Sequence, residues 1–352
     1  MQLSVTDNKD LFSREDTSFF KGIAVLILLF IHLFSEKRGD LFFSFIQLNG
    51  NPLLSYLTLP GQMVVSIFLI LSGYGLTQSY QKNVTNGIVQ NLKKSFIRIF
   101  KLMKLYWFIG ILSGIAVTFG GYILIGDIYH NVFEMIIDLL GLAYLFNEPT
   151  LNTAWWYMTI IIIAYLLFPI GYRIVKSHPK PVFIGTNIVV FIFLIFFRHG
   201  RQAGAADFVI WIVPFIWGIY ASEYHIFEKI RKSDMHKRIG RTIILCLLFI
   251  PLLLIKQILH TYVFDGYLAV IEIYMLLTLK DSLKINFLEK FLIYLGNKSY
   301  SIYLFHSIYI LFFPQFVYWL KYPMLIFLYF LGVCILTDKI IMFLYNKMRR
   351  SI

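Results

Sequence analysis

Residues 17–34, TSFFKGIAVLILLFIHLF, form an apolar run about as long as a bilayer is thick, and Lys21 and His32 are its only ionisable residues. Eleven positions separate the two, which is three helical turns plus about 20°, so both side chains leave the same face of a helix roughly 16 Å apart along its axis. Ionisable groups inside a span are costly and therefore suggest function. In the alternative, Lys21 only snorkels to the interface and His32 packs against a neighbouring helix.

The composition is that of a helical integral membrane protein. Of the 352 residues, 59% are hydrophobic and 14% are charged, whereas soluble domains are about a quarter charged. The apolar runs are too long for the alternating strands of an outer-membrane barrel. The net charge of +13 lies in loops between spans, which is typical of an orientation signal and excludes nucleic acid as the expected partner. The two cysteines and eight histidines show no disulfide or metal-binding spacing, so we expect no metal.

The apolar runs predict an all-α membrane bundle of about ten transmembrane helices in a single domain, 1–352, with one short re-entrant or interfacial segment. The first run lacks a cleavage signature and is interpreted as a retained span. Residues 1–17 are expected to be a short cytoplasmic segment and 345–352 a short basic cytoplasmic tail. The expected spans are 18–34, 60–80, a third ending near 119, 154–173, 182–197, 206–222, 242–259, 264–280, 299–319 and 323–344.

The segment 132–147 decides the topology. It is short and carries Glu134 and Asp138. If it crossed the membrane, the basic loop after residue 173 would lie outside, so the positive-inside rule favours a re-entrant or interfacial segment. Both termini are then cytoplasmic, and all but six of the 32 Lys and Arg residues lie on or near the cytoplasmic side; the six are Lys37, Arg38, Arg198, Arg201, Lys256 and Lys321.

A basic ridge precedes the third span. Arg98, Lys101 and Lys104 recur every three residues and therefore share one side of a helix. With Lys21 they could bind the phosphates of a cytosolic ligand. The alternative is that they contact lipid headgroups and set the orientation of the chain.

Histidine is the residue type best suited to abstract a proton from a hydroxyl near neutral pH. His32 could be such a base, with Glu36 one turn further along to orient its ring, although Glu36 could equally be an exposed loop acid. His306 lies in another expected span, where a packing role and a role in a site are both open. Ser72, Glu272 and Asp338 are further polar residues inside the expected spans.

Five motifs, in order along nearly the whole chain, resemble those of the membrane-bound acyltransferase family three. They are Lys21-x10-His32 for R-x10-H, 68–74 (FLILSGY) for FF-x-L-S-G-F, 98–101 (RIFK) for R-x-x-R, 155–169 (WWYMTIIIIAYLLFP) for W-[WF]-[YF]-L…Y-L-x-x-P, and 295–306 (LGNKSYSIYLFH) for L-G-x-x-S-Y-x-x-Y-L-x-H. Lysine replaces arginine at positions 21 and 101, which removes the bidentate fork of the guanidinium. The Trp155 span also lacks the acidic residue that some members carry, which leaves the acid partner of His32 unidentified.

The resemblance implies an enzyme that moves an acyl group, usually acetyl, from cytosolic acyl-CoA to a hydroxyl of a surface polysaccharide or its lipid-linked precursor. It implies His32 as the catalytic residue and Lys21, Arg98 and Lys101 as ligands of the donor phosphates, with Lys104 on the same ridge. Acetyl-CoA would be a co-substrate, and no permanently bound cofactor is expected. Residues expected to support the site or line the acceptor pocket are Ser72, Trp155, Trp156, Tyr157, Tyr300 and His306.

The resemblance also implies a bacterial protein of the cytoplasmic membrane, whose partners are the lipid bilayer, acyl-CoA and a glycan acceptor. A glycan flippase or exporter is the alternative, with Glu272 and Asp338 on the substrate path. A glycan polymerase would be expected to have a large outer loop rich in Arg and His, which this sequence lacks. The acyl group, the acceptor sugar, direct transfer against a covalent intermediate, and the oligomeric state stay open.

Overall fold

The computed structural model describes residues 12–82, 88–120, 125–196, 205–259, 261–283 and 285–351, and most of them are helical. The α-helices are α1 (Arg14–Phe34), α2 (Leu53–Tyr56), α3 (Val64–Gln81), α4 (Ile88–Phe119), α5 (Ile125–Ile128), α6 (Val132–Leu139), α7 (Ala143–Phe146), α8 (Trp156–Ser177), α9 (Pro179–Phe196), α10 (Ala205–Glu223), α11 (Ile226–Lys232), α12 (Met235–Ile258), α13 (Asp265–Leu283), α14 (Asn286–Asn297), α15 (Ser299–Phe312), α16 (Pro314–Tyr318) and α17 (Pro323–Ser351). Short 3₁₀ helices are η2 (Glu36–Leu41), η3 (Pro60–Met63) and η4 (Thr153–Trp155), and β1 (Gln47–Leu48) pairs antiparallel with β2 (Asn51–Pro52).

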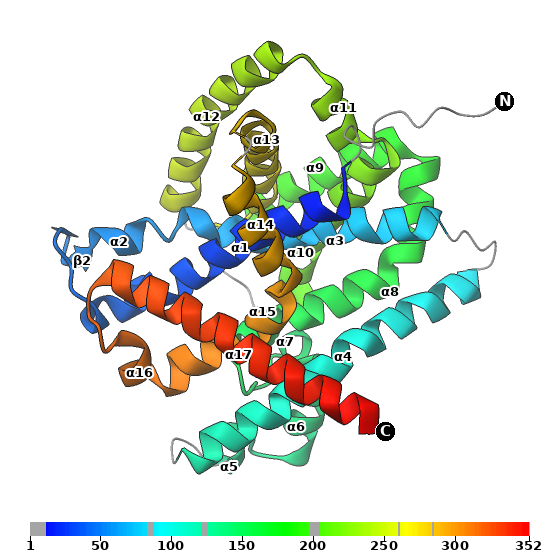
Figure 1. Cartoon of the computed structure of the whole chain (residues 1–352). Coiled ribbons are helices and arrows are strands. Elements are labelled where there is room, and N and C mark those ends of the chain that lie inside the picture. The colour runs from blue at the N-terminus through cyan, green and yellow to red at the C-terminus, as the bar shows by residue number, and fades with distance from the viewer. Residues whose placement is uncertain are drawn as a thin grey trace.

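The protein is an all-α membrane bundle, as the sequence predicted. Among the described residues seven helices are long and apolar enough to cross a bilayer, or eight if α10 and α11, which are bent by 57°, form one span. The expected count of about ten is therefore not confirmed. If α10 is counted, the two expected spans that do not qualify are α13, which carries four charged residues, and α15, which is only 14 residues long and ends at a break at Phe313. Figure 1 shows that α1 begins and α17 ends on the same side of the bundle.

The segment 132–147 does not cross the membrane, since it forms the short helices α6 and α7. The break between them is at Gly141, whose φ of +70° favours glycine. Asp138 of α6 is buried and accepts hydrogen bonds from the Tyr129 hydroxyl at 2.5 Å and the Leu151 backbone N–H at 3.0 Å. Burial and this carboxylate raise the pKa of the Tyr129 hydroxyl, so it stays protonated and donates.

Helix α1 carries the stripe from Lys21 to His32. It begins at a capping box in which Ser13 Oγ accepts from the Asp16 N–H at 3.1 Å and the Asp16 carboxylate accepts from the Ser13 N–H at 2.7 Å. From there it continues without a break to Phe34, so the helical spacing predicted from the sequence holds along the whole stripe.

Helices α1 and α14 cross at two glycines and are nearly in contact there. A Cβ atom on Gly22 would lie 2.0 Å from the Leu292 carbonyl oxygen, and one on Gly296 would lie 1.7 Å from the Ser18 carbonyl oxygen. Such crossings, with small residues that let backbones approach, are the usual way helices associate in a membrane. The crossing fixes the level of the following helix, α15, against α1.

Helices α3 and α10 use the same device. A Cβ on Gly73 would lie 2.2 Å from the Phe215 carbonyl oxygen, and one on Gly218 would lie 2.1 Å from the Ile70 carbonyl oxygen. Because these contacts are with backbone atoms, neither helix can yield locally to a side chain. The two helices must move apart or tilt to accept one.

We expect Gly218→Ala to destabilise the protein by about 1–3 kcal/mol, the usual cost of an atom forced into a packed interface. The measurement is the Tm of the detergent-solubilised protein, taken as the temperature at which the monodisperse peak on size-exclusion chromatography is lost. Gly332→Ala is the matched control, since a Cβ there meets nothing within 4 Å. An equal Tm for the two variants would contradict the tight α3–α10 crossing.

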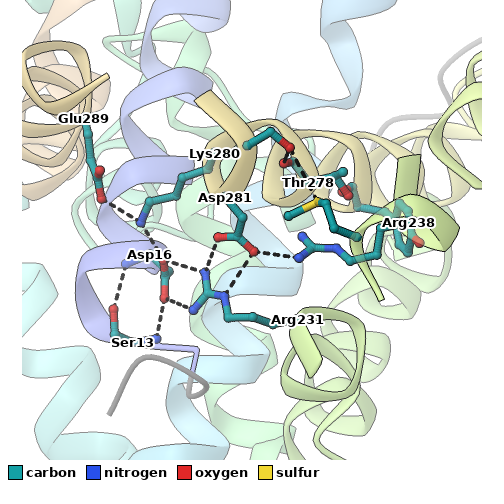
Figure 2. A network of polar contacts seen from close by, with 11 residues as sticks. Ser13, Asp16, Arg231, Arg238, Thr278, Lys280, Asp281 and Glu289 are labelled. Carbon is teal, nitrogen blue, oxygen red and sulfur yellow. Dashed lines mark hydrogen bonds and ion pairs between the residues drawn. The ribbon is translucent and has the colours of Figure 1, made fainter. Parts of the chain in front are cut away.

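An ion network joins five helices at the end of the bundle where α1 begins (Figure 2). Asp16 on α1 binds Arg231 of α11 at 3.0 Å and Lys280 of α13 at 2.5 Å. Asp281 of α13 binds Arg231 at 3.4 Å and Arg238 of α12 at 2.9 Å. Lys280 also reaches α14, at Glu289. With three acids and three bases the network is electrically balanced, so we assign it to the positioning of α12 and α13 on α1.

Candidate active site

A cavity of about 930 Å³ lies inside the bundle, and both Lys21 and His32 line it. The face of α1 that carries Lys21 and His32, which the sequence predicted, therefore forms one wall of this cavity. The other walls come from α2, η3, α3, α4, η4, α8, α10, α12, the start of α13 with the segment that leads into it, and α15. These walls carry charged and hydroxyl side chains together with several aromatic side chains.

Lys21 lies toward the end of the cavity near the start of α1, which we call the Lys21 end. Ser299 and Tyr300 of α15 line the cavity too, and the crossing of Gly296 over Ser18 places them near this end. No described residue forms an ion pair with Lys21. A cation that faces a cavity without a protein counter-ion is a natural site for an anionic ligand.

His32 and His306 form a hydrogen-bonded imidazole pair. His32 Nδ1 lies 2.6 Å from His306 Nε2, and the rings are parallel within 14° with centroids 4.8 Å apart. These values fit two nearly coplanar rings joined edge to edge, because an N–N distance of 2.6 Å plus the two ring radii spans that separation. His306 is fully buried, whereas His32 lines the cavity.

The backbone of α15 sets the tautomer of both rings. His306 Nδ1 lies 2.9 Å from the Tyr303 carbonyl oxygen and 3.0 Å from the Ile302 carbonyl oxygen. Carbonyl oxygens only accept, so Nδ1 carries the hydrogen and Nε2 of the neutral ring accepts. His32 Nδ1 must then donate, which places the lone pair of a neutral His32 on Nε2. This is the arrangement in which one imidazole is oriented as a base by a second group.

The sequence offered Glu36 as a group that could orient His32 and left His306 open between a packing role and a role in a site. The structure places His306 beside His32, because the Gly22–Gly296 crossing sets α15 level with α1. The side chain of Glu36 lies outside the described residues. The partner of His32 that the structure shows is therefore an imidazole and not a carboxylate.

The basic ridge does not line the cavity. Arg98 is half-buried and donates to Ser79 Oγ at 2.7 Å. Lys101 and Lys104 are exposed on α4, and Lys104 Nζ lies 4.9 Å from the centre of the Phe100 ring. The structure therefore brings Lys21 and His32 to one chamber and leaves the ridge outside it.

The remaining predicted site residues divide into two groups. Those that line the cavity are Ser72, Trp156, Tyr157 and Tyr300. Trp155 lies behind the wall, where its indole N–H donates to the Leu304 carbonyl oxygen at 2.8 Å. Tyr303 donates in turn to the Ala154 carbonyl oxygen at 2.7 Å. These two bonds fasten the start of α8 to α15 and so support the helix that carries His306.

Sequence reasoning missed the polar end of the cavity opposite Lys21, which we call the Lys256 end. Lys256 of α12 and Asp265 of α13 both line the cavity and form an ion pair at 2.5 Å. Asp265 lies at the edge of an expected span, where an acidic residue is common and does not indicate a site. The signal available was Lys256, one of the six basic residues that broke the positive-inside pattern.

The fold and the site together define an integral membrane protein with an internal cavity that is lined by a lysine and by an oriented histidine. No group of three or more potential metal ligands occurs in the described parts of the chain. A family model described as an acyltransferase domain matches residues 17–341. The chain therefore belongs to acyltransferase family 3 and is a membrane acyltransferase. The comparisons find no match among curated proteins and none among solved structures.

Proposed function

We propose that this acyltransferase moves an acetyl group from cytosolic acetyl-CoA to a hydroxyl of a cell-surface polysaccharide or of its lipid-linked precursor. The observation that carries the proposal is that Lys21 and His32 line one cavity. Their separation of roughly 16 Å along α1 suits a long pantetheine arm, with the phosphates at Lys21 and the thioester near His32. We place the protein in a bacterial cytoplasmic membrane with both termini cytoplasmic, which the distribution of Lys and Arg supports.

In this mechanism His32 acts as the general base. Nε2 takes the proton of the acceptor hydroxyl as its oxygen attacks the thioester carbonyl carbon, so a C–O bond forms and the C–S bond breaks. The leaving CoA thiolate takes the proton from the His32 imidazolium, which restores the neutral ring. His306 holds the ring throughout, because its Nε2 accepts from His32 Nδ1.

The exporter alternative receives less support from the positions of the intramembrane acids. Asp338 is buried against Lys298 and Ser301, which neutralise it and bind it within the protein. Glu272 is buried on α13 and is not among the residues that line the cavity. Neither acid therefore faces the chamber through which a glycan would pass.

Transfer of labelled acetyl from acetyl-CoA to surface polysaccharide in membrane vesicles tests the proposal. We expect Lys21→Gln to raise the KM for acetyl-CoA about ten- to hundredfold, since a hydrogen bond to a charged group contributes about 1.5–3 kcal/mol. Lys104→Gln is the matched control, because Lys104 is exposed outside the cavity. A wild type that transfers no label would refute the acetyltransferase function, and equal KM values for the two variants would refute the role of Lys21.

A further inference from the structure

The Lys256 end of the cavity is a polar site buried at membrane depth. The exposed fraction of the side chain is 6% for Lys256 and 1% for Asp265, and the two charged atoms lie 2.5 Å apart. Lys256 Nζ also lies 3.4 Å from the Leu59 carbonyl oxygen. Removing two charges from water is costly, and a buried pair of this kind is weak evidence for stability alone. A pair on the wall of a chamber can recover part of that cost by hydrogen bonding to a ligand.

A series of contacts through η3 links this pair to the part of α1 that carries the imidazole. Helix η3 packs on α1, where a Cβ on Gly61 would lie 2.7 Å from Ile31 Cδ1, one residue from His32. Leu59, which accepts from Lys256, comes two residues before Gly61. The histidine and the ion pair therefore flank one short helix and open to the same cavity.

Aromatic side chains complete this end of the cavity. Trp211 and Tyr262 both line it, and their rings stack with centroids 5.2 Å apart and planes within 6°. The indole N–H of Trp211 is buried and donates to no group in the described residues. This end of the cavity thus combines an aromatic surface with an N–H donor, a carboxylate and an ammonium group. Small-ligand sites are typically of this kind, with largely apolar walls and a few polar groups that fix the ligand.

We infer that the Lys256 end is the acceptor subsite and that it binds a neutral sugar ring with free neighbouring hydroxyls; this inference rests on the proposed function. Asp265 accepts from one hydroxyl and Lys256 donates to the next, both as charge-assisted hydrogen bonds. The apolar face of the ring packs on the aromatic surface. A further hydroxyl of the bound sugar then reaches Nε2 of His32. Because the charges of the pair cancel, the subsite favours an uncharged sugar.

A purely structural role would be to hold α12 on α13. The same two helices are joined at their other end by Arg238 and Asp281, 2.9 Å apart and away from the cavity. Asp281→Asn therefore weakens the same helix pair without touching the subsite and is the matched control for Asp265→Asn. The double variant Lys256→Gln with Asp265→Asn keeps a neutral hydrogen-bonded pair in place of the charges.

The test uses the full-length protein in vesicles, labelled acetyl-CoA, and the cell's own surface polysaccharide stripped of acetyl groups by mild alkali. We expect Asp265→Asn and the double variant to raise the KM for polysaccharide about tenfold or more, with the KM for acetyl-CoA and acetyl-CoA hydrolysis without acceptor within about twofold of wild type. Asp281→Asn should leave the KM for polysaccharide unchanged. Equal effects of Asp265→Asn and Asp281→Asn, or no effect of Asp265→Asn, would overturn the subsite.

Trp211→Phe keeps the aromatic ring and removes only the N–H, so it provides an independent reading if Asp265→Asn fails to accumulate. We expect a higher KM for polysaccharide with an unchanged KM for acetyl-CoA, and an unchanged KM for both substrates would overturn the subsite. If the wild type acetylates no polysaccharide at all, the proposed function fails and the subsite fails with it. That outcome is distinct from a wild type that is active and variants that match it.

Discussion

Replacing His32 with glutamine is expected to lower acetyl transfer at least about hundredfold, and by up to about 10⁴-fold, which is the range that general-base catalysis contributes. Glutamine retains polarity and nearly the volume of the ring but cannot take up a proton near neutral pH. The hydrogen bond to His306 would be the main structural loss, so the protein should still reach the membrane. Proton NMR of surface glycan, read for O-acetyl signals at matched protein levels, measures the effect.

His236→Gln is the control for this variant, because His236 is an exposed residue at the start of α12 and does not line the cavity. O-acetyl content should be unchanged in the control. Acetylation that persists in His32→Gln at the wild-type level would exclude His32 as the base. Loss of the glycan itself from the surface, rather than of its acetyl groups, would favour the exporter.

A comparison of the wild type with His32→Gln also distinguishes direct transfer from a covalent route. In the covalent route, His32 Nε2 attacks the thioester carbonyl carbon, so an N–C bond forms, the C–S bond breaks and the CoA thiolate leaves; the acetyl group stays on His32 until the acceptor arrives. Wild type mixed with labelled acetyl-CoA and no acceptor would then retain label that His32→Gln lacks. We propose direct attack by the hydroxyl, for which neither protein retains label on its chain.

The stripe from Lys21 to His32 could be read from the sequence because it depends only on the period of one helix. Helix α1 has no break between the two residues, so the angular calculation holds. The failure of 132–147 to span could also be predicted, from its short length, from Glu134 and Asp138, and from the positive-inside rule applied to the basic loop after residue 173. Features of this kind need no knowledge of a neighbouring helix.

The partner of His32 could not be predicted, because it depends on how two distant helices are set against each other. His306 follows His32 by 274 positions. Its level against α1 is set by the crossing at Gly22 and Gly296, and the sequence does not indicate which helix either glycine contacts. The role offered for Glu36, the nearest carboxylate in the sequence, stays a prediction, because its side chain lies outside the described residues.

The Lys256 end was hidden for a related reason. Positive-inside counting treats each lysine separately, so Lys256 was only an exception to a rule. Its meaning depends on Asp265, which lies across a turn and at the start of the next helix. The count of about ten spans is not confirmed, in part because hydropathy alone cannot show that residues 299–319 break at Phe313.

The hydrogen bond between the two imidazoles has its own expected result. We expect His306→Leu to lower kcat about hundredfold while leaving the KM for acetyl-CoA and for polysaccharide nearly unchanged. The reason is that leucine cannot accept from His32 Nδ1, so the base loses its orientation, and a misplaced reacting group costs about that much. His306 touches neither substrate, because it is fully buried behind His32. It is a positioning residue.

His306→Gln distinguishes positioning from simple packing. The glutamine amide oxygen can accept from His32 Nδ1, so this variant should recover a substantial part of kcat. Leucine, however, suits a fully buried site better than an amide does, because an imperfectly bonded buried amide carries a desolvation cost. We therefore expect opposite orders: Gln above Leu in kcat, and Leu at or above Gln in Tm. If activity and Tm follow the same order, His306 serves only to pack α15 against α1, and the orientation of His32 must come from another group.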